Sequence, residues 1–216
     1  MRREKLCLIF LIILSMCSCF ANAAIIQTLG FYNVTNNNSY DAAIGETQLF
    51  LDISSNINNQ AIFTFRNLSG GQASSIAEIY FDDSKNNTAL SDIDCIIDNP
   101  PTVDFQQDKV APKNLPGGET LDPDFKAEKS FSLEPENPAP YYGVNPGESV
   151  SVVFNLKSNT TIQDLINDLQ TENLRIGIHV IAFSSGGSES FVNAVPEPAT
   201  ITMLGIGALA LLRKKR

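Results

Sequence analysis

The chain has 216 residues and a formal net charge of −9, and its length suits one domain of ordinary size. The charge imbalance lies in residues 24–195, where eight Lys and Arg stand against twenty-two Asp and Glu, a net charge of −14. Because an acidic surface repels nucleic acid and anionic lipid head groups, we expect neither as a partner, and cations or neutral and basic polymers remain candidates.

The first 23 residues have the parts of a secretory signal peptide. Arg2, Arg3 and Lys5 precede an apolar run over residues 6–16. Ala21 and Ala23 then place small residues where cleavage requires them. We therefore predict export, with residues 1–23 removed by cleavage after Ala23.

One cysteine, Cys95, follows this segment, so the exported body has no internal disulfide. Acidic neighbours such as Asp94 disfavour its thiolate, which argues against a nucleophilic role. We expect Cys95 to be a small buried hydrophobe beside Ile93, Ile96 and Ile97.

The predicted ectodomain, residues 24–193, begins with β-rich runs separated by Asn, Ser and Gly. Gly70 and Gly71 separate two of these runs, which we predict to be hairpin partners. The four expected strands cover residues 25–32, 47–53, 61–68 and 75–81.

Residues 98–146 contain nine of the eleven prolines. Proline cannot donate to a β-ladder, so we predict a long excursion from the sheets rather than central strands. Short edge strands are expected at residues 102–105 and 129–133. Aromatic residues such as Phe125 indicate that the excursion folds back on the body, because burial of their rings removes a large apolar area from water.

One helix is predicted, at residues 162–170. Ile162, Leu165, Ile166 and Leu169 recur at helical spacing and form a single apolar face. Thr161 is the expected N-cap, with Asp164 three residues on completing a capping box.

Strands are expected on both sides of this helix, at residues 148–156 and 174–183, and a last strand at 189–193 closes a hairpin across a Gly/Ser turn. Eight to ten strands and one short helix predict an all-β fold. The architecture we expect is an antiparallel, jelly-roll-like β-sandwich.

His179 is the only histidine, and strand alternation places it on one sheet face with Gly177 and Ile181. One imidazole cannot supply a multi-histidine zinc site, and no G-x-S-x-G nucleophile motif is present. We expect a structural or surface histidine. A glycosidase needs only two carboxylates, but no pair is singled out, and we predict that the protein is not an enzyme.

Asp82, Ser84 and Asn86 place oxygen donors at alternate positions, as at the start of a calcium loop. Asn87 then stands in place of the turn glycine, and Ile93 in place of the bidentate glutamate. We predict a solvated turn and no cofactor, with calcium binding by this loop as the alternative.

Residues 194–216 have three parts in a fixed order: a short motif at 195–198, an uncharged apolar run at 199–212 and a basic end at 213–216. An apolar helix followed by a basic cluster is typical of a membrane stop whose basic end stays in the cytoplasm. The run covers about 21 Å at 1.5 Å per residue, less than a bilayer core of roughly 30 Å, which favours a temporary hold. The motif and the basic end consist of Val195, Pro196, Glu197, Pro198, Arg213, Lys214, Lys215 and Arg216.

This order of parts resembles the PEP-CTERM sorting signal of exported bacterial proteins. In that family the signal is recognised, and cut near Pro-Glu-Pro, by a membrane-embedded exosortase. The resemblance implies two partners, an exosortase-type protease and the bilayer. It also implies a transient stay in the inner membrane with the C-terminus in the cytoplasm, followed by delivery to the cell surface or extracellular matrix.

Residues 63–67, 79–83 and 176–180, the last followed by 186–191, look like pieces of other PEP-CTERM proteins that have a β-sandwich ectodomain. From that setting we expect a structural or adhesive role in exopolysaccharide or biofilm, with extracellular polysaccharide as a partner. The alternatives are a carbohydrate- or calcium-binding module and, from another class, a secreted hydrolase.

Overall fold

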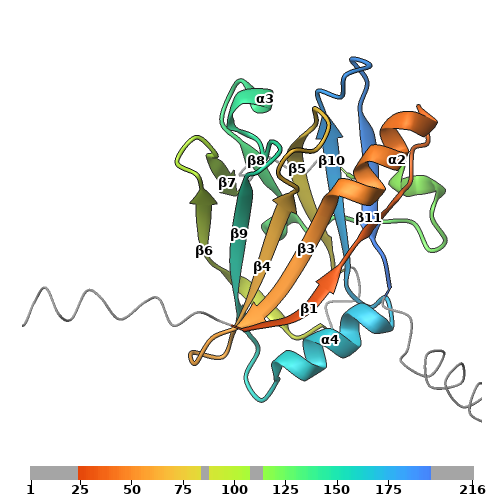
Figure 1. The fold of residues 1–216 in the computed structure, drawn as a ribbon. Helices are drawn as coiled ribbons and strands as arrows, with labels where there is room; N and C mark the ends of the chain where they lie inside the picture. The colour runs from red at the N-terminus through yellow and green to blue at the C-terminus, as the bar shows by residue number, and fades with distance from the viewer. Residues whose placement is uncertain (1–23, 84–87, 108–113, 196–216) are drawn as a thin grey trace, which may run out of the picture.

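The computed structural model describes residues 24–83, 88–107 and 114–195, which form two β-sheets packed face to face (Figure 1). Sheet A has the strand order β1-β3-β4-β9-β6 and sheet B the order β2-β11-β10-β5-β8-β7. Neighbouring strands in both sheets pair antiparallel. The elements are β1 (Ile25–Leu29), β2 (Phe31–Asn33), α2 (Ser39–Gln48), β3 (Leu49–Ser55), β4 (Gln60–Asn67), β5 (Ser75–Asp82), β6 (Leu90–Asn99), β7 (Phe105–Gln107), η1 (Gly118–Thr120), η2 (Lys129–Phe131), β8 (Leu133–Pro135), α3 (Ala139–Tyr142), β9 (Ser149–Leu156), α4 (Ile162–Gln170), β10 (Arg175–Ile181) and β11 (Glu189–Asn193).

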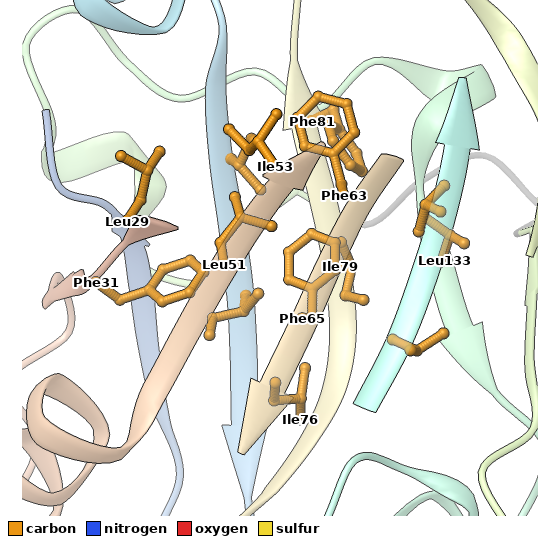
Figure 2. Packing of buried hydrophobic residues seen from close by; sticks show 14 of the residues in the cluster. Leu29, Phe31, Leu51, Ile53, Phe63, Phe65, Ile76, Ile79, Phe81 and Leu133 are labelled. Atoms are coloured by element: carbon orange, nitrogen blue, oxygen red, sulfur yellow. The ribbon is translucent and has the colours of Figure 1, made fainter. Parts of the chain in front are cut away.

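The core lies between the two sheets (Figure 2) and is centred on phenylalanine rings. Phe63 and Phe65 of β4 meet Phe81 of β5 edge to face, with ring centroids 5.3 and 6.1 Å apart. Phe154 of β9 lies 4.9 Å from Phe81 and 5.0 Å from Phe131 in the same manner. Each of these contacts stabilises the sandwich by about 0.5–1.5 kcal/mol beyond the area that the rings bury.

The mostly β, antiparallel fold predicted from the sequence is confirmed, as is the helix at Ile162–Gln170. The side chain of Thr161 accepts from the backbone N–H of Asp164, whose carboxylate accepts from the N–H of Thr161, so the predicted capping box is present. The hairpin of β10 and β11 is also confirmed. The jelly-roll likeness stays a prediction.

The segment predicted to form the first strand forms two strands in the structure. Residues 25–32 divide at Gly30: β1 pairs with β3 in sheet A, whereas β2 pairs with β11 in sheet B. The chain therefore passes from one sheet to the other within its first ten described residues.

The predicted hairpin across Gly70 and Gly71 is wrong. β4 pairs with β3 and β9 in sheet A, whereas β5 pairs with β10 and β8 in sheet B. A glycine pair between two strands is compatible with a hairpin and with a crossover to the other sheet. The alternation within β5 does not decide between them, because both faces of this strand are buried.

Helix α2 was not predicted, and the strand expected at residues 47–53 begins at Leu49 instead. Its sequence has no apolar stripe, but Asn38 caps it by accepting from the backbone N–H groups of Tyr40 and Asp41. The helix packs closely on β11, since a Cβ added to Gly45 would lie 2.1 Å from Cζ of Phe191. Tertiary packing therefore stabilises a segment whose local pattern is weak.

The expectation that Cys95 is buried is also wrong: the residue is exposed on the edge strand β6. Irregularities in the pairing of β6 with β9 fall at Ser91 and Asp94, and each changes the phase of the strand. Ile93 and Ile96 consequently pack against the core, whereas Cys95 does not.

Residues 98–146 contain the short strands β7 and β8 and the single-turn helix α3. The edge strands predicted at residues 102–105 and 129–133 overlap β7 and β8 by one residue each, and Lys129–Phe131 is the 3-10 helix η2 instead of a strand. The predicted signal peptide, residues 1–23, and the predicted membrane helix, residues 199–212, lie outside the described residues. Within the described ranges, none of the helices has the length and apolarity needed to cross a bilayer.

Candidate functional site

The outer face of sheet B is partly covered by residues from the proline-rich excursion. Leu115 and Phe125 form a small apolar cluster with Tyr80 of β5 and Val192 of β11. Gly177 of β10 makes this close approach feasible, because a Cβ there would lie 2.9 Å from Leu115 and 3.1 Å from Phe125.

A buried ion pair ties this cover to the sheet. Arg175 of β10 pairs with Asp82 of β5, and their side chains are only 8% and 2% exposed. The Arg175 guanidinium also donates to the backbone carbonyls of Pro123 and Asp124, at 2.7 Å each, and lies 5.4 Å from the ring centroid of Phe125. The guanidinium therefore holds sheet and excursion together.

Beyond the covered part lies a pocket of about 210 Å³, which we call the outer-face pocket. Nδ1 of His179 lies 3.0 Å from Oε2 of Glu78, and the hydroxyl of Tyr80 donates to the same oxygen at 2.7 Å. The side chains of His179 and Glu78 are each 20% exposed. The lining residues are Ala77, Glu78, Glu134, Pro135, Asn137, Ala139, His179 and Ile181.

Strand pairing brings these side chains together from distant parts of the chain. His179 is the direct cross-strand partner of Glu78, and Leu133 is that of Ile79. Antiparallel pairing one residue further places Glu134 beside Glu78. Glu78 lies on the outer face because it alternates with Ile79 of the core, and a bulge in β5 at Ala77 allows Ile76 to enter the core as well.

The pocket presents two carboxylates, an imidazole and an amide. An ionised Glu78 can only accept, so Nδ1 of a neutral His179 is assigned as the donor and Nε2 as an acceptor. Among the described lining residues there is no Ser, Thr or Cys that the imidazole could activate. Nor do the described residues contain a group of three His, Cys, Asp or Glu arranged to hold a metal.

The last strand leads directly into the C-terminal segment. β11 ends at Asn193, and the backbone N–H of Ala194 donates to the carbonyl of Gly30 at 2.9 Å. Val195, the first residue of the motif at 195–198, is half-buried. Two residues thus separate the final strand from Pro196.

A family model described as the PEP-CTERM protein-sorting motif matches residues 194–216. The chain therefore carries a PEP-CTERM sorting motif in residues 194–216. The motif implies export and processing by an exosortase, which is a membrane protein. No curated protein and no solved structure matches the chain.

Most of the predicted sorting residues lie outside the described residues. These are the cleavage positions Ala21 and Ala23, the motif residues Pro196, Glu197 and Pro198, and the basic end Arg213, Lys214, Lys215 and Arg216. The family match covers the motif and the basic end, whereas the cleavage positions stay a prediction.

Of the calcium candidates, Ser84 and Asn86 lie outside the described residues, and Asp82 is the buried partner of Arg175. Close by, Asp83 accepts from the hydroxyl of Thr88 at 2.9 Å. Burial raises the pKa of Asp168, and the carboxylate of Asp83 raises it further. Calcium binding by this loop stays a prediction.

The other singled-out residues are placed as follows. His179 lies on the outer face of sheet B with Gly177 and Ile181, as alternation predicts. Partial burial of the Cys95 thiol and the nearby Asp94 carboxylate both raise the pKa of Cys95, which keeps it a poor nucleophile. Sequence reasoning missed Glu78 and Glu134, since only the strand pairing connects them to His179.

Proposed function

We propose that this protein is a structural or adhesive protein of the cell surface or extracellular matrix, with a role in exopolysaccharide or biofilm. The observation that carries the proposal is the position of the sorting motif, which starts at residue 194, directly after β11. With so short a connection, exosortase processing acts at the border of the sandwich, and the sandwich is the part that reaches the outside.

The charge of the exported body supports a surface role. The strongly acidic body is suited to remain soluble outside the cell, because like-charged domains repel one another. The outer-face pocket favours a binding module as the second candidate function.

The sorting step can be tested by replacing Pro196, Glu197 and Pro198 with alanine. The expected result is retention of the protein in the inner membrane, measured by fractionation of cells expressing the full chain. Glu136→Ala is the control for the change at Glu197, because Glu136 also follows a proline but is exposed within the folded domain. Unchanged delivery of the triple variant to the surface would contradict the proposal.

The role itself needs a separate measurement. Deletion of the gene is expected to reduce surface attachment or the yield of extracellular matrix, and the wild-type gene should restore it. If the protein is found at the surface but its loss changes neither quantity, the structural or adhesive role is wrong while the sorting claim stands.

A further inference from the structure

The outer-face pocket has a chemistry that selects among ligands. Its polar lining consists of the carboxylates of Glu78 and Glu134, the imidazole of His179 and the amide of Asn137. The remaining lining side chains, Ala77, Pro135, Ala139 and Ile181, are aliphatic. A ligand that fits this lining combines hydrogen-bond donors with an apolar stem.

The electrostatics favour a cation. Glu134 and Glu78 are neighbours on adjacent strands, and the exported body carries a large excess of acidic residues. An excess of one sign of charge raises the local concentration of oppositely charged ligands. A carboxylate has about four acceptor positions, so Glu78, whose contacts within the protein include His179 and Tyr80, can also accept from a ligand.

The imidazole contributes a further acceptor. Because Nδ1 of His179 is engaged by Glu78, the unprotonated Nε2 can accept a hydrogen bond, and none of the described residues donates one to it. Two carboxylates and one imidazole nitrogen match the three N–H donors of a primary ammonium group.

The lining also argues against other ligand classes. A pyranose ring commonly stacks on an aromatic side chain, and none of the described lining residues is aromatic. The size of about 210 Å³ is below the roughly 300–1,000 Å³ of pockets that hold drug-sized ligands, so the pocket fits one small group. A lysine side chain, a compact ammonium on a four-carbon stem, has this size and character.

We propose that the outer-face pocket binds a primary ammonium group on an aliphatic chain, as presented by a lysine side chain of a partner protein. Glu78 and Glu134 accept from the ammonium, His179 supplies the third acceptor, and Pro135 and Ile181 contact the methylenes. This goes beyond the proposed surface role, which specifies no ligand.

The test is a calorimetric titration of the full-length protein, purified in detergent, with Nα-acetyl-lysine methylamide. Saturable binding is expected. The Nε-acetylated form of the same probe, which keeps the stem and removes the charge, should not bind. Glucosamine and glucose report whether a sugar ring is preferred to the aliphatic stem.

Glu134→Gln should weaken binding of the lysine probe about tenfold or more, because it removes a charge-assisted hydrogen bond. The variant leaves the contacts of Glu78 with Tyr80 and His179 in place. Glu136→Gln is the matched control, since it removes the same charge from an exposed residue outside the lining and should bind as the wild type does.

The proposal is overturned by any of three results: no saturable binding of the lysine probe, equal binding of its acetylated form, or tighter binding of either sugar. All three comparisons need only the wild-type protein, so they decide even if Glu134→Gln does not fold. None of these results depends on sorting, and the surface role can therefore fail or stand independently.

Discussion

Two arginine–aspartate pairs, one on the outer face of each sheet, differ chiefly in their burial. On sheet A, Arg66 pairs with Asp52, and the arginine side chain is 34% exposed. On sheet B, Arg175 pairs with Asp82, and the arginine side chain is 8% exposed. The two pairs have the same chemical groups, so a difference in their effect on stability reports on their surroundings.

Both guanidinium groups lie over a phenylalanine ring, but the rings belong to different kinds of segment. Arg66 lies 5.3 Å from the ring of Phe50, within the same sheet. Arg175 lies over Phe125, which belongs to the excursion. The pair on sheet A, with its partly exposed arginine, thus joins side chains of one sheet, whereas the pair on sheet B attaches a second layer to the sandwich. The difference shows that the excursion packs on sheet B and is held there by a side chain of that sheet.

Arg175→Met should have the largest effect, a loss of about 3–5 kcal/mol in unfolding free energy, because it leaves the Asp82 carboxylate buried without its cation. The excursion should also become susceptible to limited proteolysis. Arg66→Met is the comparison variant and should cost less, because the Arg66 side chain is 34% exposed and Asp52 keeps the hydrogen bond from the Thr28 hydroxyl. Urea denaturation of both variants checks the difference, and equal losses would refute the distinction between the sheets.

A second comparison concerns two carboxylates with lowered pKa values, Glu189 on sheet B and Asp92 on sheet A. Burial raises the pKa of Glu189, but hydrogen bonds from Thr35 and Asn33 and from the backbone around Asn37 lower it overall. Because the folded-state pKa lies below the unfolded one, the stabilisation is fully present above the unfolded pKa. It is lost as the pH falls through the folded-state pKa.

Glu189→Gln should therefore cost about 1.5–3 kcal/mol at pH 7, the range for hydrogen bonds to a charged group. The gap to wild type should narrow as the pH is lowered through and below the ordinary glutamate pKa of 4.5. Denaturation at several pH values measures this gap. Asp92→Asn on the exposed edge strand is the control and should change little, and a gap that widens in acid would contradict the assignment.

The smallest effect is expected on the open face of sheet A, where the hydroxyls of Thr64 and Ser151 lie 2.8 Å apart. Thr64→Val should cost about 0.5–1.5 kcal/mol by removing one neutral hydrogen bond. Adding Ser151→Ala should recover part of that loss, since no hydroxyl is then left without its partner. Thermal melts of the single and double variants test this, and a larger loss in the double variant would count against it.

The sequence predicts elements whose signals are local. The capping box of Thr161 and Asp164 and the apolar face of α4 lie within ten residues, and the hairpin of β10 and β11 is joined by a short turn. Helix α2 could not be predicted in this way, because the contact that favours it joins Gly45 to Phe191, far along the chain.

Long-range pairing also limits what could be predicted about the candidate site. Alternation places His179 on a sheet face, but nothing in the sequence indicates that Glu78, about 100 residues earlier, is its partner. The hairpin wrongly predicted across Gly70 and Gly71 placed β5 in the other sheet, away from β10. The sorting motif, by contrast, is a contiguous signal read by another protein, and its prediction required no fold.

The position of β11 also determines how the domain carries a mechanical load. β11 lies between β2 and β10, and both neighbours run antiparallel to it. Tension applied at Asn193 along the strand acts on the hydrogen bonds of both ladders at once, in shear, rather than separating them one at a time. A pull on Asn193 in the direction of β11 is therefore resisted by two ladders, one of which belongs to β2 near the start of the described residues.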